Sequence, residues 1–338
     1  MRDRGNSGRT GMEATRRQAL ALGALAASAA RARPLRASEP RATVWITAAG
    51  DPVRALDLVF ARLPRDLASG KRLVLKANFN SADPFPAASA PDTLDALVAR
   101  LASMRPSRFT LAERSGMGDT RAVLRQAGVP ALAARHGLEV LVLDELGPEG
   151  WVAVRRPDLH WRRGFLLARA FAEAELVVQT CCLKTHRFGG HFTMALKNAV
   201  GAVAKVDPAD GYDYMRELHA SPHQRAMIAE ISTAFRHDLV IMDARKGFRT
   251  GGPESGTLVE PGLFLASRDP VAIDAVGVAI LRRYGTTAEV ARGPIFAQEQ
   301  LARAAALGIG VASAAAIELE GLDEAGRRAS EELRPLLV

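Results

Sequence analysis

The sequence predicts an α/β fold, with a mostly parallel or mixed central sheet and helices on both of its faces. Two observations lead to this fold class. Short apolar runs of strand character recur along the chain, and stretches with helical periodicity separate them at the spacing of βαβ units. The chain has 338 residues, of which 48% are hydrophobic and 24% charged. This is enough for a large core, built as one domain or as two closely joined lobes.

Predicted strands and helices alternate most clearly in the first half of the chain. Apolar runs predict strands at residues 43–47, 72–76, 108–113 and 138–143. Helical periodicity predicts helices at residues 53–63, 92–104, 120–126 and 131–136. Asp92 or Thr93 is expected to cap the second helix by accepting hydrogen bonds from its first free N–H groups. Helices therefore separate each predicted strand from the next, which favours parallel pairing.

The second half is less regular. Residues 151–154 and 159–161 are expected to form short strands outside the main sheet, and residues 164–174 a helix. Further strands are predicted at 175–181, 238–243, 262–267 and 316–320, and further helices at 194–203, 223–235, 269–284 and 296–307. Residues 205–221 form a polar loop that is expected to lie over the site as a lid. The folded domain is thus expected at residues 38–322, with a C-terminal tail at 323–338.

The first 37 residues are typical of an export signal. They hold eight arginines against two acidic residues, which accounts for +6 of the chain's net charge of +8. The remainder carries only +2, so the charge does not indicate nucleic-acid binding. The pair Arg16-Arg17 precedes an apolar stretch at 19–30 that is too short to span a bilayer. We therefore predict a twin-arginine signal read by the export machinery, a periplasmic location and no transmembrane segment in the mature protein.

The two cysteines, Cys181 and Cys182, are neighbours on a predicted strand. Adjacent strand residues point to opposite faces, so a disulfide between them would be strained. Two cysteines also fall short of the four thiolates that an iron–sulfur cluster requires. No iron–sulfur cluster is expected.

Lysine is rare in this chain, since only six of its 45 basic residues are lysines. Where arginine supplies the ordinary surface charge, lysine is expected where a compact charge, a shifted pKa or a nucleophile is needed. Four of the six lie at predicted strand ends or in the stretch 183–198, and three of the four asparagines lie beside them. These residues are Lys76, Lys184, Lys197 and Lys246, with Asn78, Asn80 and Asn198.

The stretch 183–198 directly follows a predicted strand, where open α/β sheets bind their ligands. Its four candidate catalytic residues are Lys184, His186, His191 and Lys197. The two histidines are also candidate metal ligands, although their spacing alone fixes no coordination geometry. Other strand ends, a glycine-rich loop at 244–256 and a helix start add candidate ligand-binding residues. These are Lys76, Asn78, Glu113, Ser115, Asn198, Asp243, Lys246, Gly251, Gly252 and Asp269.

This collection of lysines and glycine-rich backbone suits a phosphate, a carboxylate or an anionic cofactor. The common nucleotide and hydrolase signatures are missing from the sequence. No Gly-Lys-Ser/Thr follows the glycine loop, no Gly-x-Gly-x-x-Gly opens a helix, and there is no Gly-x-Ser-x-Gly. Asp269, followed by Pro270, also has the character of a helix cap.

Several of these motifs resemble, in the same order, those of the domain-of-unknown-function family 362. The resemblance spans residues 70–322. Its pieces are Leu75–Asn78, Glu113–Gly116, Leu183–His186, Leu196–Gly201, Met242-Asp243 with the loop to Gly256, Asp269–Ala275 and Ala304–Gly321. It implies an α/β fold but no reaction, and the ferredoxin-like cysteine cluster of many relatives has no counterpart here. A more distant, fold-level similarity to the lactate racemase family, with its nickel-pincer nucleotide, implies a cofactor anchor at Lys184 and acid/base or metal groups at His186 or His191.

Three functions follow as hypotheses. The first is an exported enzyme that holds a divalent metal or an anionic nucleotide-type cofactor with Lys76, Lys184, His186, Lys197 and Lys246. The second is a periplasmic binding protein for a small anionic ligand, in which the lysines only neutralise charge. The third is an assembly factor for an exported redox protein.

Overall fold

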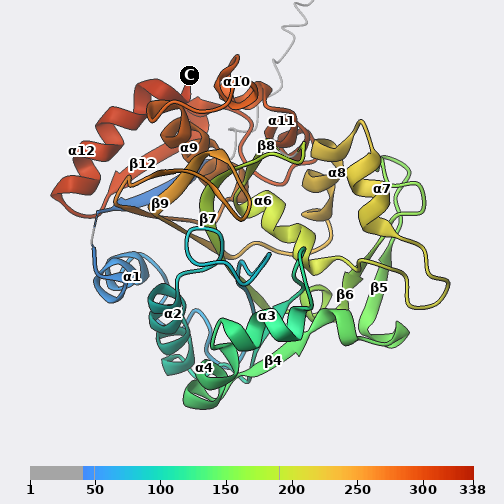
Figure 1. Cartoon of the computed structure of the whole chain (residues 1–338). Coiled ribbons are helices and arrows are strands. Elements are labelled where there is room, and N and C mark those ends of the chain that lie inside the picture. The colour runs from blue at the N-terminus through green and yellow to red at the C-terminus, as the bar shows by residue number, and fades with distance from the viewer. Residues whose placement is uncertain (1–40, 49, 190) are drawn as a thin grey trace, which may run out of the picture. The chain divides into compact units, whose positions relative to one another are not determined.

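A large mixed sheet forms the centre of the fold (Figure 1). The computed structural model describes residues 41–48, 50–189 and 191–338. Within them the strands follow the order β12-β1-β11-β9-β7-β2-β3-β4, with β8 paired to β7 and β10 paired to β9. The strands are β1 (Ala42–Thr47), β2 (Arg72–Lys76), β3 (Arg108–Glu113), β4 (Glu139–Val142), β7 (Leu176–His186), β8 (His191–Thr193), β9 (Leu239–Gly251), β10 (Gly256–Val259), β11 (Leu263–Ser267) and β12 (Ile317–Gly321).

Most neighbouring strands are parallel, as the alternation of apolar runs and helices predicted. Strands β9, β7, β2, β3 and β4 run in one direction. Strand β11 is antiparallel to both β9 and β1, while β12 is parallel to β1. The predicted fold class is therefore confirmed: the protein has a mixed α/β fold with a large, mostly parallel sheet and helices around it.

Helices cover both faces of this sheet (Figure 1). Because side chains alternate between the faces of a strand, Val44 and Ile46 of β1 pack on one face and Trp45 on the other. The Trp45 face is covered by α1 (Pro52–Phe60), α2 (Pro91–Ser103), α3 (Thr120–Gln126) and α4 (Val129–His136). The Val44 face is covered by α9 (Pro270–Arg283), α11 (Glu299–Ala306) and α12 (Glu324–Leu333).

The second face has another covering layer near β2 and β3. Val74 and Ala112 pack there against a separate hairpin and two helices. These elements are β5 (Trp151–Val154), β6 (Phe165–Ala168), α7 (Tyr214–Ala220) and α8 (Gln224–Ile231). The shorter elements are α5 (Arg169–Ala172), α6 (Ala195–Asn198), α10 (Ala288–Ala291), η1 (Leu143–Glu145), η2 (Pro148–Gly150), η3 (Ala199–Ala202), η4 (Ile295–Ala297), η5 (Ala314–Ala316) and η6 (Arg334–Leu337).

Several local expectations were wrong. The helix expected at 164–174 is strand β6 followed by the single turn α5, because β6 pairs with β5. Residues 159–161 form no strand. Strand β7 was expected to end at residue 181 but continues to His186, because it forms a hairpin with β8. Helix α2 starts at Pro91 with Ala90 as its N-cap, so neither Asp92 nor Thr93 caps it.

The segment 323–338, expected as a C-terminal tail, is instead part of the folded unit that covers residues 39–338. It forms α12 and η6, and Leu333 and Leu337 are buried in the core. Asp323 caps α12 by accepting a hydrogen bond from the backbone N–H of Gly326 at 2.6 Å. Among the residues that the structure describes, no helix has the length and apolar character needed to cross a bilayer. The export signal lies outside these residues and stays a prediction.

Candidate functional site

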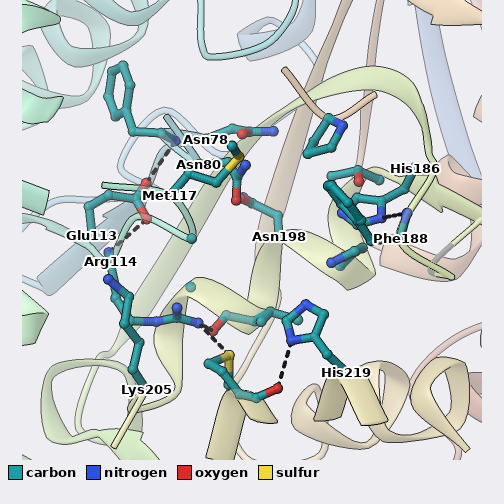
Figure 2. A pocket seen from close by; sticks show the side chains of 18 of the residues that line it. Asn78, Asn80, Glu113, Arg114, Met117, His186, Phe188, Asn198, Lys205 and His219 are labelled. Carbon is teal, nitrogen blue, oxygen red and sulfur yellow. Dashed lines mark hydrogen bonds between the residues drawn. The ribbon is translucent and has the colours of Figure 1, made fainter. Parts of the chain in front are cut away.

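The candidate site lies where the strand order changes direction. From β2 the chain continues to β3 and β4 on one side, then returns to place β7 on the other side of β2. Such a reversal leaves a crevice at the carboxyl ends of the strands. A cavity of about 320 Å³ occurs there (Figure 2). Its lining residues are Lys76, Asn78, Phe79, Asn80, Glu113, Arg114, Gly116, Met117, His186, Phe188, Thr193, Lys197, Asn198, Val200, Gly201, Lys205, Val206, Asp213, Met215, His219 and Pro253.

Six of the fourteen predicted site residues line this cavity. They come from the ends of β2, β3 and β7 and from α6, and they are Lys76, Asn78, Glu113, His186, Lys197 and Asn198. The other eight lie elsewhere in the fold and are Lys184, His191, Ser115, Asp243, Lys246, Gly251, Gly252 and Asp269.

A buried ion pair stands at the ends of β2 and β3. Lys76 and Glu113 are only 2% and 1% exposed, and Nζ of Lys76 donates to Oε1 of Glu113 and, at 2.9 Å, to the carbonyl of Ala77. Glu113 also accepts from the backbone N–H groups of Phe79 and Arg114, at 3.2 and 2.9 Å. Burial lowers the pKa of Lys76 and raises the pKa of Glu113, and each charge opposes the shift of the other. The pair therefore adds no net charge to the cavity.

The backbone of η3 packs directly on this ion pair. A Cβ atom at Gly201 would lie 2.7 Å from Nζ of Lys76 and 3.1 Å from Oε1 of Glu113. We expect Gly201→Ala to destabilise the protein by about 1–3 kcal/mol, because the added Cβ displaces Nζ of Lys76 from its hydrogen bonds to Glu113 and Ala77. Urea unfolding measures this change. The control, Gly50→Ala, adds a Cβ with no atom within 4 Å, and its effect is expected within about 0.5 kcal/mol. Equal stability of the two variants would contradict this prediction.

Three residues that line the cavity each have a buried polar atom with no hydrogen-bond partner in the described part of the chain. The atoms are Nδ2 of Asn78, Nε of Arg114 and Oγ1 of Thr193, and the three residues are 3%, 3% and 8% exposed. All three atoms can donate a hydrogen bond. A buried donor that stays unpaired costs about 1–3 kcal/mol. Three unpaired donors therefore belong to residues around one cavity.

Arg114 was not among the predicted site residues, although it directly follows Glu113. Its Nη2 donates to the carbonyl of Val200 in η3 and contacts Sδ of Met215 at 3.4 Å, which fixes the guanidinium against the cavity. Burial lowers the pKa of Arg114, but a guanidinium stays charged in proteins. Sequence reasoning missed it because one more arginine in an arginine-rich chain carries little signal.

Two histidines face the cavity with opposite hydrogen-bonding roles. Nδ1 of His186 accepts from the backbone N–H of Phe188 at 3.3 Å, so the neutral ring carries its proton on Nε2. Burial and the charges of Lys197 and Lys184 lower the pKa of His186 far below its usual range. His219 has its Nδ1 2.7 Å from the carbonyl of Met215. A carbonyl only accepts, so Nδ1 of His219 donates and its Nε2 is left as an acceptor.

His219 belongs to residues 205–221, the polar segment expected to act as a lid. Five residues of this segment line the cavity, namely Lys205, Val206, Asp213, Met215 and His219. Val206 is exposed at the cavity, as are Met117 and Phe188. In Figure 2 Glu113 and Arg114 lie across the cavity from His186 and Phe188. The cavity thus combines cationic donors with exposed apolar side chains.

Lys184, Ser115 and Asp243 are buried in the fold and do not line the cavity. Nζ of Lys184 donates to the carbonyl of Ala87. Asp243 accepts from Thr93 at 2.7 Å and from Arg245 at 2.9 Å. The roles that the structure shows for these side chains are contacts between elements of the fold.

Lys246 and Asp269 also have partners outside the cavity. Lys246 is half exposed and forms a surface ion pair with Glu260 at 3.3 Å. Asp269 accepts from Val271 and Ala272 at 2.8 Å each and so caps α9, as its position before Pro270 suggested.

The glycine-rich loop is the extension of β9 and its hairpin with β10. Gly252 has φ of +69°, and a Cβ there would lie 2.0 Å from the carbonyl oxygen of Thr185 in β7. Gly251 has φ of +81°, and its Cβ would meet Ser255 and Gly256 across the hairpin. The glycines of this loop therefore allow two strands to approach each other closely, where the sequence suggested that they allow the backbone to approach a ligand.

The side chains do not fit a metal site at His186 and His191. The two residues are opposite each other in the β7–β8 hairpin, but His191 does not line the cavity. The charges acting on His191 are those of Arg225, Glu289 and Glu299. Across residues 41–48, 50–189 and 191–338, no group of three or more His, Cys, Asp or Glu side chains is placed to hold a metal ion. The free cysteines are buried, and burial raises the pKa of both thiols.

Comparisons with known proteins place the chain in a family. The lactate racemase apoprotein from Thermoanaerobacterium thermosaccharolyticum is a similar solved structure, with 16% sequence identity and a TM-score of 0.39. The match covers 62% of this chain and 51% of that one, so the chain spans about half the length of that structure. No curated protein matches the chain. The family model "Domain of unknown function (DUF362)" matches residues 73–279, which is more than half of the sequence, and the chain therefore belongs to this family.

Proposed function

We propose that the protein is an enzyme that binds a small organic anion, a carboxylate or a phosphate, in the cavity at the ends of β2, β3 and β7. The observation that carries this proposal is the set of unpaired donors on Asn78, Arg114 and Thr193. Carboxylate and phosphate oxygens match such donors, and an arginine at the site makes these hydrogen bonds charge-assisted.

The charges around the cavity also support an anion. Lys76 is neutralised by Glu113, and Lys205 by Asp144 at 2.9 Å. Arg114 has no carboxylate within 4 Å among the described residues, so its positive charge is available to a ligand. Asp213 is exposed and accepts from the backbone N–H of Arg216, which directs its charge toward the start of α7.

The size of the cavity limits the ligand. A volume of about 320 Å³ is at the lower end of the range for small-molecule pockets, roughly 300–1,000 Å³. Met117, Phe188 and Val206 offer apolar contact beside the donors. The ligand is therefore a small anion with an apolar part.

Catalysis, rather than binding alone, is supported by two groups that can move protons. The pKa of Lys197 is lowered to about 8, first by burial and then by the charges of Arg114 and Lys184. Nε2 of His219 is an acceptor, because its Nδ1 is bound to Met215. Groups that exchange protons near neutral pH are those used in general acid–base catalysis.

Thermal unfolding with a panel of phosphate, pyruvate, phenylpyruvate and benzoate tests the binding step. A panel member at about 100 times its Kd is expected to raise the Tm by roughly 5 °C. Arg114→Gln is expected to remove this increase, while Lys246→Gln, outside the cavity, keeps it. A Tm that no panel anion changes, or that changes equally in Arg114→Gln, would contradict the proposal. If every anion that raises the Tm is recovered chemically unchanged, the protein binds anions but does not catalyse a reaction on them.

A further inference from the structure

Lys197 differs from the other lysines of the chain in its contacts. The other five each have a partner for Nζ, which is a carbonyl for Lys71 and Lys184 and a carboxylate for Lys76, Lys205 and Lys246. Nζ of Lys197 has no acceptor in the part of the chain that the structure describes. Yet Lys197 is only 9% exposed and lines the cavity. A buried ammonium without a counter-charge is unfavourable, whereas a neutral amine is tolerated there.

A neutral lysine amine has a chemistry that an arginine lacks. Its lone pair attacks carbonyl carbon atoms, and a lowered pKa makes more of the reactive form available at neutral pH. The pKa of about 8 for Lys197 agrees with this role. In a chain with 45 basic residues and only six lysines, a lysine at this position is consistent with a need for an amine.

The groups around Lys197 suit a carbonyl compound that carries an anion. Asn78, Arg114 and Thr193 provide donors for carboxylate or phosphate oxygens, as described above. Burial and the charges of Lys197 and Arg114 lower the pKa of His219, so its ring is held neutral and Nε2 keeps a lone pair that can accept a proton during a reaction. The cavity thus contains a nucleophile, an anchor for the anion and a group for proton transfer.

We propose that the substrates are anionic carbonyl compounds, such as 2-oxo acids or phosphorylated aldehydes, and that Nζ of Lys197 condenses with their carbonyl group to form an imine. This inference rests on the proposed function, because it requires the anion to bind in the same cavity. Nζ bonds to the carbonyl carbon as the C=O π bond breaks, and a proton passes from the nitrogen through Nε2 of His219 to the carbonyl oxygen, which becomes a hydroxyl group. The nitrogen then gives its second proton to Nε2 of His219, which passes it to the hydroxyl; the C–O bond breaks and the C=N bond forms, so one amine and one carbonyl give one imine and one water.

Reductive trapping tests the imine. The full chain is incubated with pyruvate, phenylpyruvate or glyceraldehyde 3-phosphate, reduced with cyanoborohydride, and digested for mass spectrometry. At least one of these probes is expected to modify Lys197 at least tenfold more than any other lysine, and the probe with the highest yield identifies the anion as carboxylate or phosphate. The yield is expected to rise with pH around 8 rather than around 10.5. Labelling spread evenly over the lysines, or concentrated on exposed Lys246, would overturn the proposal.

Variants separate this inference from the proposed function. Lys197→Arg and Lys197→Gln are expected to abolish the adduct, while Lys246→Arg keeps it; circular dichroism checks that each variant is folded. If the probes raise the Tm through Arg114 but leave Lys197 unmodified, imine formation is wrong and anion binding stands. If no anion binds, both proposals are wrong.

Discussion

Replacing Lys76 with methionine is expected to lower the free energy of unfolding by about 3–5 kcal/mol at pH 7. The change leaves Glu113 buried without its counter-charge, and loss of one partner from a buried ion pair has a cost of this size. Methionine keeps the length of the side chain, so the loss arises mainly from the charge. The backbone N–H groups of Phe79 and Arg114 still donate to Glu113, but they carry no full charge.

The pH dependence of this variant has a definite sign. Without Lys76, burial is the main influence on Glu113, and the raised pKa of its carboxyl rises further. A carboxyl whose pKa is higher in the folded state stabilises the protein at low pH, and this stabilisation is lost as the pH rises through the folded pKa. Lys76→Met is therefore expected to be closer to wild type at pH 5 than at pH 8.

Urea unfolding at both pH values measures the effect. The double variant Lys76→Met/Glu113→Gln is expected to recover much of the loss, because no unpaired charge is left inside the protein. The surface pair Lys246–Glu260 offers a matched control, since Lys246→Met is expected to change stability by less than about 1 kcal/mol. If Lys76→Met and Lys246→Met lowered the free energy of unfolding equally, the buried ion pair would contribute no more than the surface pair, and the prediction would be wrong.

The fold class and the first four strands were predictable because their signal is local. Apolar runs such as 72–76 and 108–113 end at polar residues, and the sheet places those ends together at one edge. Lys76 and Glu113 were therefore predictable as residues at strand ends, but their ion pair was not predicted. The length of β7 was not predictable, because Lys184 and His186 interrupt its apolar run and are buried only through contacts with distant parts of the chain.

The rest of the site depends on contacts that the sequence does not display. Nζ of Lys184 donates to the carbonyl of Ala87, 97 residues away, so its predicted position after a strand did not reveal that it does not line the cavity. His219 lines the cavity only because α7 packs with η3 in the covering layer near β2 and β3. The unpaired state of Lys197 likewise emerges only when the partners of all six lysines are known.

Asp274 connects helix α9 to the segment that carries Lys197. This contact was not predicted from the sequence. Asp274 lies in α9, is fully buried, and accepts from the backbone N–H groups of Ala195 and Leu196 at 2.7 and 3.0 Å. These N–H groups begin α6, whose N-cap Met194 provides no side-chain hydrogen bond. A helix of four residues has little stability of its own. Asp274 is therefore a positioning residue for the segment that carries Lys197.

Asp274→Ala is expected to destabilise the protein by about 4 kcal/mol at pH 5, because it leaves two buried N–H groups unpaired at roughly 1–3 kcal/mol each. Burial raises the pKa of Asp274 to about 7, against the effect of these two donors. Its unfolded pKa is about 3.9, so its contribution is present below pH 4 and is lost as the pH rises through 7. The free energy of unfolding of the wild type thus falls by on the order of 3 kcal/mol between pH 5 and pH 8. The variant, which has no carboxyl at this position, does not show this decrease.

Urea unfolding of wild type and Asp274→Ala across this range tests the prediction, because contributions from the other titrating groups largely cancel in the difference. The two stability curves are expected to converge as the pH rises. Hydrogen exchange at the amides of Ala195 and Leu196 is expected to become faster in the variant. As a control, Asp57→Ala in α1 removes an exposed carboxylate, and its curve of stability against pH is expected to run parallel to that of the wild type. Parallel curves for Asp274→Ala would show that this carboxyl does not titrate in the folded protein, and unchanged amide exchange would show that it does not hold α6.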